Sequence, residues 1–268
     1  MFFDAKNGCI NVNGAEMDYI AFGKGEKNLV MLPGAGDGLK TAKGLAIPFS
    51  ILFRQYAKDF RVYVFSRRNN LPEGFSTKDM AEDVVSAMDY LDIPSAGFLG
   101  VSQGGMISQQ VAIHHPDKVN KLVLAVTSSK PNALLSEVIS QWIEWAKTDD
   151  YKKIMIDMAV RSYTGRYQKI SEKIYKMLGN LGKPKDFARF IIICQSCIDH
   201  NAYDVLEQIK CPVYIIGAGQ DQVLGVEASR EIAGKIEGSE LYIYDEYSHG
   251  VYDQAKDFHQ RILEFMKR

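Results

Sequence analysis

The chain has 268 residues, of which 46% are hydrophobic and 24% charged, close to the average of a soluble globular protein. Its 32 basic and 33 acidic residues give a formal net charge of -1, which offers no long-range field for nucleic acid or anionic lipid. The composition therefore excludes a disordered chain and predicts a sizeable apolar core, with neither nucleic acid nor a membrane as partner.

The first residues contain no basic stretch followed by an apolar core, and no later apolar run approaches the ~18 residues of a membrane span. We therefore expect a cytoplasmic protein, either a monomer or a homodimer. Cys194 and Cys197 form a C-x-x-C, with His200 three residues further on. Because a second pair of ligands is missing, we interpret this motif as the packing face of a helix and expect no metal.

The predicted elements begin with a hairpin, because Asn13-Gly14 lies between two stretches of alternating apolar residues. Short apolar runs then recur along the chain, and most of them are continuous rather than alternating. Continuous runs are typical of strands buried on both faces of a parallel sheet. The six predicted parallel strands are residues 29–32, 62–65, 98–101, 122–126, 213–216 and 241–244.

Amphipathic stretches of helical length separate most of these strands. The clearest begins at Ser76 with Asp79 three residues later, which is a capping-box pattern, and it stops before Pro94. The alternation of strands and helices predicts an α/β fold, a mostly parallel twisted sheet flanked by helices and preceded by an antiparallel hairpin.

Residues 129–210 interrupt this alternation, because they contain no convincing strand and are too many for an ordinary loop. We predict a helical insertion that forms a cap, or lid, while residues 1–128 and 211–268 form the core. The four predicted helices of the insertion are residues 134–147, 151–163, 170–178 and 187–198.

The motif Gly100-Val101-Ser102-Gln103-Gly104 lies between an apolar strand and a helix that ends near His114. A serine on a sharp turn from strand to helix points its hydroxyl out of the sheet, and the strained backbone tolerates only small neighbours. The motif therefore predicts a nucleophile elbow with Ser102 as the nucleophile.

At this motif the sequence resembles the α/β-hydrolase fold family, and the resemblance covers nearly the whole chain outside the insertion. The resemblance implies a catalytic triad in the order nucleophile, acid, histidine. Asp221 and His249 follow the last two predicted strands and fill these positions. Asp245 is the rival acid, but it lies four residues before His249 and its chain would have to double back. We predict the triad Ser102, Asp221 and His249.

The segment Pro33-Gly34-Ala35-Gly36 follows the first parallel strand and lacks the ending of a phosphate-binding loop. The resemblance implies an oxyanion hole formed by the backbone N–H groups of Ala35 and Gln103. The segment Phe65–Asn70 resembles the arginine-bearing loop that follows the second parallel strand in this family, where it would organise the fold near the site.

The resemblance implies a serine hydrolase that cleaves a small acyl compound through a Ser102 acyl-enzyme, without a cofactor, with a carboxylic ester as the favoured substrate. C–C bond hydrolases, thioesterases, aminopeptidases, haloperoxidases and acyltransferases use the same triad, and a ligand receptor of this fold is a further alternative. Apolar side chains of the insertion suggest an apolar pocket: Leu134, Ile139, Trp142, Ile143, Met155, Met158 and Tyr163.

Overall fold

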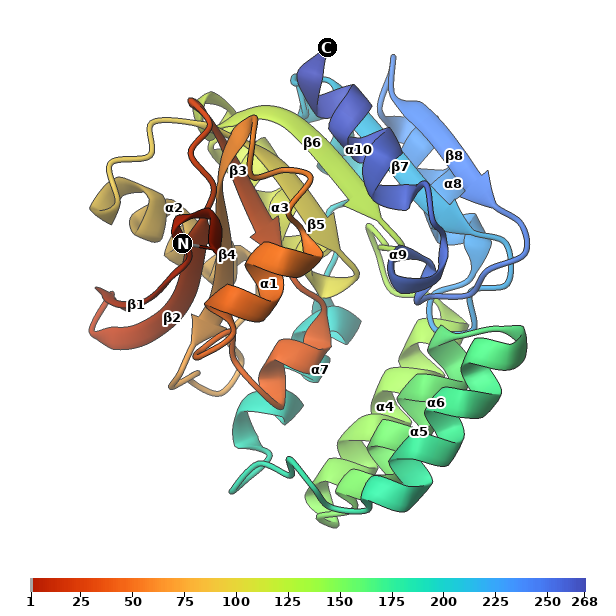
Figure 1. Ribbon diagram of the computed structural model, residues 1–268. Helices are drawn as coiled ribbons and strands as arrows, with labels where there is room; N and C mark the ends of the chain where they lie inside the picture. Colours follow the sequence, from red (N-terminus) through yellow and green to blue (C-terminus); the bar gives the residue numbers. More distant parts are fainter. Residues whose placement is uncertain (1) are drawn as a thin grey trace.

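The computed structural model describes residues 2–268. Its strands form an eight-stranded sheet in the order β1-β2-β4-β3-β5-β6-β7-β8. Strand β2 is antiparallel to β1 and β4, and the other neighbours are parallel (Figure 1). The predicted fold class is confirmed. The strands are β1 (Lys6–Val12), β2 (Ala15–Phe22), β3 (Lys27–Leu32), β4 (Phe60–Arg68), β5 (Ala96–Val101), β6 (Val119–Ala125), β7 (Val213–Ala218) and β8 (Glu240–Tyr244).

Ten α-helices and four short 3-10 helices connect or follow these strands within the described residues. The α-helices are α1 (Ala46–Leu52), α2 (Thr77–Tyr90), α3 (Gln103–His114), α4 (Ala133–Lys147), α5 (Tyr151–Ser162), α6 (Gly165–Leu178), α7 (Ala188–Asp199), α8 (Val226–Lys235), α9 (Val251–Gln254) and α10 (Phe258–Lys267). The 3-10 helices are η1 (Phe2–Asp4), η2 (Ala35–Gly38), η3 (Pro116–Lys118) and η4 (Tyr203–Gln208).

The turn between β1 and β2 is the one that the sequence predicts. Asn13 and Gly14 have φ angles of 50° and 82°, so both occupy the left-handed region that a two-residue hairpin turn requires. Strand β2 then pairs with β4, so the hairpin adds an antiparallel edge to the parallel strands.

The continuous apolar runs of the central strands arise because the sheet has a core on each face. In β3, Val30 and Leu32 belong to one apolar cluster, whereas Leu29 and Met31 belong to the other. Helices α2 and α3 contribute to the first cluster, and α10 contributes to the second. Successive side chains of a strand point to opposite faces, so a strand covered on both sides is apolar at every position.

Helices α4 to α7 lie between β6 and β7 in the chain, where the sequence predicts a helical insertion. Figure 1 shows α4, α5 and α6 packed side by side beyond the ends of the neighbouring strands β7 and β8. The helix predicted at residues 170–178 begins earlier, at Gly165. The prediction missed its first turn because that turn is polar and carries no apolar pattern. The boundaries of the cap stay a prediction.

The predicted strand 62–65 continues through residues 66–68, which belong to strand β4. The expectation that these three residues form part of a loop is therefore wrong. Strand β2 explains the difference, because Tyr19 pairs with Phe65 and Met17 pairs with Arg68. An antiparallel partner on this edge supplies hydrogen bonds beyond the point where the parallel neighbour β3 ends, so β4 continues.

Cys194 and Cys197 lie on the buried face of α7, which is the interpretation that the sequence favours. Burial raises the pKa of the Cys197 thiol to about 12, so this thiol stays protonated at neutral pH. His200 is also buried, and its Nδ1 lies 2.8 Å from the Thr77 hydroxyl.

The buried His200 predicts a loss of stability in acid. Burial lowers its pKa from 6.5 to about 3, so between these values the unfolded chain binds a proton that the folded chain does not. The free energy of unfolding therefore falls as the pH drops below about 6.5, by about 2 kcal/mol at pH 5 from this group. Urea unfolding at pH 7.5 and pH 5 measures the loss. Between the two pH values, the free energy of unfolding should fall less in the His200→Gln variant than in the wild-type protein. An equal fall in both proteins would show that His200 is not its origin.

Candidate active site

Ser102 occupies a strained turn between β5 and α3. Its φ and ψ angles are 54° and -121°, a backbone conformation that residues other than glycine rarely adopt. Two hydrogen bonds hold this backbone: Ser102 N donates to Ala125 O at 2.9 Å, and Thr127 Oγ1 donates to Ser102 O at 2.7 Å. The neighbouring strand therefore maintains the geometry that the motif predicts for a nucleophile elbow.

The glycines around Ser102 are required by close contacts. A Cβ atom at Gly104 would lie 1.9 Å from the carbonyl oxygen of Leu32, and one at Gly100 would lie 2.5 Å from Ser108 Oγ. Both distances are far below van der Waals contact. The spacing of the motif thus reflects how tightly α3 approaches β3 and β5.

His249 follows β8 and lies against Asp221, which follows β7. The distance between His249 Nδ1 and Asp221 Oδ2 is 2.9 Å, and both side chains are buried. Asp221 Oδ1 accepts hydrogen bonds from the amides of Val223 at 2.8 Å and Leu224 at 2.9 Å. Burial alone would raise the pKa of Asp221, but His249 and these two amides outweigh it and hold the pKa below its usual value. The carboxylate is therefore ionised at neutral pH and orients the imidazole.

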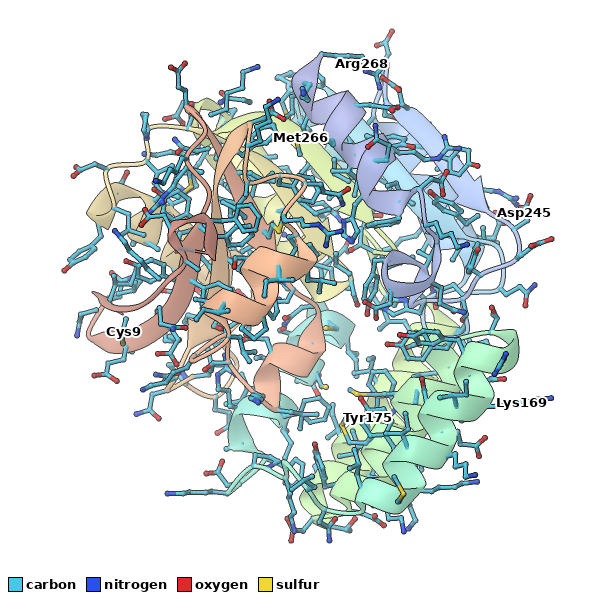
Figure 2. All side chains as sticks on the ribbon, viewed as in Figure 1. Cys9, Lys169, Tyr175, Asp245, Met266 and Arg268 are labelled. Atoms are coloured by element: carbon cyan, nitrogen blue, oxygen red, sulfur yellow. The ribbon has the colours of Figure 1, made fainter. Side chains whose placement is uncertain are left out.

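Asp245, the rival acid in the sequence, is exposed. Its side chain points away from the body of the molecule (Figure 2). Other histidines also have separate environments: His115 Nε2 lies 2.9 Å from Glu82 Oε1, and His259 Nδ1 lies 3.0 Å from the Tyr56 hydroxyl. Of the two candidate acids, the structure thus brings Asp221, and not Asp245, to His249.

Ala35 and Gln103 are the first residues of η2 and α3, where backbone N–H groups have no acceptor within their own helix. Neither amide donates a hydrogen bond to another part of the described chain. A Cβ atom at Gly34 would lie 3.2 Å from Ser102 Cβ, so the segment that leads to Ala35 passes directly beside the serine. Two free donors therefore begin helices next to Ser102, as an oxyanion hole requires.

Arg67 connects the two loops that carry these amides. Its guanidinium is buried and donates both to the carbonyl oxygen of Pro33 and to Gln103 Oε1, the latter at 2.6 Å. The Gln103 side chain in turn donates to Ser196 Oγ at 2.8 Å and to Ile193 O at 3.0 Å. The sequence gives no sign of these bonds, which join segments far apart in the chain. They fix the relative position of Pro33 and Gln103.

A cavity of about 710 Å³ contains Ser102 and His249 on its wall. The insertion supplies the apolar side chains of Ile139, Trp142 and Met158 to the same wall, whereas Leu134 and Ile143 pack into the core instead. Residues of α1 and the turn after it also line the cavity, a contribution that the sequence did not predict: Phe49, Leu52 and Phe53. No hydrogen bond joins Ser102 Oγ to His249 among the described residues; such bonds often tighten only when substrate binds.

The sheet order, the elbow and the helices between β6 and β7 together define a protein of the α/β-hydrolase class. A family model described as the alpha/beta hydrolase fold matches residues 27–256. The chain belongs to this family of hydrolases. No helix among residues 2–268 is long and apolar enough to cross a membrane.

Several characterised proteins are similar to this chain. It is 24% identical to 3-oxoadipate enol-lactonase 2 of Acinetobacter baylyi over 189 residues, 70% of either chain. It is also 24% identical to a 2-hydroxy-6-oxononadienedioate/2-hydroxy-6-oxononatrienedioate hydrolase of Escherichia coli over 262 residues, 92% of this chain and 89% of the relative.

Solved structures give the same fold. The enol-lactonase from Burkholderia xenovorans has a TM-score of 0.80 at 22% identity, covering 97% of this chain and 100% of its own. An alpha/beta hydrolase enzyme from a Medee basin deep-sea metagenome library has a TM-score of 0.86 at 19% identity, covering 97% of this chain and 98% of its own. At these identities the structural likeness establishes the fold and leaves the substrate open.

Proposed function

We propose that this chain is a carboxylic ester hydrolase that acts through an acyl-enzyme on Ser102, with His249 and Asp221 completing the triad. The observation that carries the proposal is the strained Ser102 turn on the wall of the cavity that also holds His249, itself 2.9 Å from Asp221. We further propose that residues 129–210 form a cap, because Ile139, Trp142 and Met158 contribute to this wall.

In the proposed reaction Ser102 Oγ attacks the ester carbonyl carbon while His249 Nε2 accepts the hydroxyl proton. The amides of Ala35 and Gln103 donate hydrogen bonds to the oxyanion that forms. When the carbon–oxygen bond breaks, His249 returns the proton to the departing alcohol. Water, activated by His249, then attacks the acyl-enzyme and releases the acid. Asp221 holds the imidazole so that Nε2 is free to accept the proton.

The charges of the cavity favour a substrate without a carboxylate. The name of the Escherichia coli hydrolase above denotes a substrate that is a dicarboxylate. Within the described residues, Lys256 is the only lysine or arginine on the cavity wall of this chain, and Asp253 on the same wall has no ion-pair partner. A dicarboxylate in this cavity would lack charge-assisted hydrogen bonds for two anionic groups. An ester with an apolar acyl group and no carboxylate fits the wall better.

A series of p-nitrophenyl esters from acetate to decanoate tests the proposal. We expect multiple turnovers, and kcat/KM should rise about fourfold per added methylene, because each buried CH₂ contributes about 0.8 kcal/mol. The rise should end when the acyl chain outgrows the cavity. A single stoichiometric release of p-nitrophenol without further turnover would favour the ligand receptor instead.

A further inference from the structure

Four tyrosines and one aspartate form a part of the cavity wall that the proposed reaction does not use. We call this group the tyrosine cluster; it consists of Tyr163, Tyr167, Tyr175, Tyr252 and Asp253. Tyr163 lies in the turn before α6, Tyr167 at the start of α6 and Tyr175 in its second half, and the last two residues come from α9. Tyr175 lies on the cavity wall, and Figure 2 shows it on the opposite side of α6 from Lys169, which points outward.

The tyrosine cluster lies beside His249. Helix α9 begins two residues after His249, and a Cβ atom at Gly250 would lie 2.5 Å from the ring of Tyr163. The rings of Tyr163 and Tyr167 are packed edge to face, with centroids 4.7 Å apart and planes inclined by 61°. The cluster therefore presents aromatic surface to a substrate held between Ser102 and His249.

Asp253 is the one acidic group of the tyrosine cluster, and among the described residues it forms no ion pair, although Lys256 lies on the same cavity wall. Tyr163 donates its hydroxyl proton to Asp253 Oδ2 at 2.8 Å. Among the described residues no lysine or arginine nitrogen lies within 4.0 Å of this carboxylate, and its other oxygen accepts no hydrogen bond. Asp37, the other carboxylate on the cavity wall, is paired with Arg189.

Asp253 is exposed on the cavity wall, and the protein atoms near its carboxyl group partly desolvate it and raise its pKa. A negative charge at this place is unfavourable unless a cation comes near. The faces of tyrosine rings also attract cations, because the ring face carries a negative electrostatic potential. Both components of the cluster thus favour a positive group, and a quaternary or protonated amine matches a mixture of aromatic faces and one carboxylate.

We propose that the tyrosine cluster binds an ammonium group of the substrate, so that the preferred esters carry a cationic amine. This inference rests on the proposed ester hydrolysis. It places the amine on the alcohol part of the ester, because His249 protonates the leaving oxygen and the cluster adjoins His249. The acyl part then lies against the apolar side chains of the insertion.

Two esters of the same shape test the inference: butyrylcholine and 3,3-dimethylbutyl butyrate, which differ only by a nitrogen cation in place of a carbon. The wild-type protein should hydrolyse the choline ester with a kcat/KM at least about tenfold higher, the equivalent of about 1.4 kcal/mol. In Asp253→Asn the ratio of the two values should fall severalfold, because only the tyrosine rings then attract the cation. Comparing the ratio, rather than either rate, cancels any effect of the substitution on the catalytic residues.

Two further variants separate this role from a purely structural contact between Asp253 and Tyr163. Tyr163→Phe removes the hydrogen bond but keeps the ring and the carboxylate, so the preference for the choline ester should persist. Asp245→Asn removes an exposed charge from the same loop region, and this variant should also keep the preference for the choline ester. If Tyr163→Phe and Asp253→Asn change the hydrolysis of both esters by the same factor, the contact is only structural and the inference is wrong.

Tetramethylammonium chloride provides a measurement that does not depend on choline ester turnover. It should competitively inhibit p-nitrophenyl acetate hydrolysis more strongly than sodium chloride at equal ionic strength. The inference is overturned if tetramethylammonium does not inhibit and the two matched butyrate esters have nearly equal kcat/KM. If neutral esters are still turned over, the proposed function stands. If no ester is hydrolysed, the proposed function fails. Protection of Ser102 from a fluorophosphonate by tetramethylammonium then still decides whether the subsite exists.

Discussion

Replacing Ser102 by alanine should lower kcat for p-nitrophenyl ester hydrolysis by about a millionfold, because the acyl-enzyme can no longer form. The loss should appear in kcat, since the proposed oxyanion donors Ala35 and Gln103 and the cavity wall are unchanged. The same variant should lose covalent labelling by a fluorophosphonate, which a gel with a fluorescent probe measures directly.

Ser162 offers a matched control, because it is a second serine on the wall of the same cavity. Ser162→Ala should keep both the labelling and the turnover. Labelling that survives in Ser102→Ala and disappears in Ser162→Ala would show that the nucleophile has been assigned to the wrong serine.

Replacing Asp221 by asparagine should lower kcat by about ten thousandfold while the protein stays folded. Oδ1 of residue 221 accepts hydrogen bonds from the amides of Val223 and Leu224, so the asparagine side chain must place its oxygen there. Its NH₂ group then faces His249 Nδ1 and donates to it. This moves the imidazole proton to Nε2, the atom that has to accept the proton of Ser102.

Stopped-flow or steady-state kinetics on one p-nitrophenyl ester measures this loss, and circular dichroism checks the fold. Asp245→Asn serves as the comparison, because Asp245 is exposed and lies on the same stretch of chain as His249. A large loss of kcat in Asp245→Asn with normal activity in Asp221→Asn would reverse the assignment of the acid.

The parts of the fold that could be predicted from the sequence are those fixed by local sterics or by one dominant environment. The central strands are apolar at every position because both faces are covered, and this holds whatever covers them. A carbonyl oxygen of β3 leaves no room for a side chain at Gly104. The two-residue turn requires the positive φ angles that Asn13 and Gly14 adopt. In each case a short stretch of residues contains the whole physical reason.

The walls of the cavity could not be predicted in the same way, because they depend on which distant segments pack together. Tyr163 and Asp253 are 90 residues apart and meet only because the end of α5 lies on the loop of His249. The side chain of Gln103 gives a similar case: its partners Arg67 and Ser196 come from β4 and α7. Neither neighbourhood leaves a pattern within any one stretch of sequence.

The turn between α5 and α6 is attached to the segment around His249 by several hydrogen bonds. Gly250 N donates to Ser162 O at 2.6 Å, Ser248 Oγ donates to Arg161 O, and Thr164 N donates to Gln254 Oε1 at 3.1 Å. These bonds attach this end of the helical pair to the segment that carries His249. We therefore expect any motion that widens the cavity to be smallest at this turn and largest at the far end of α6.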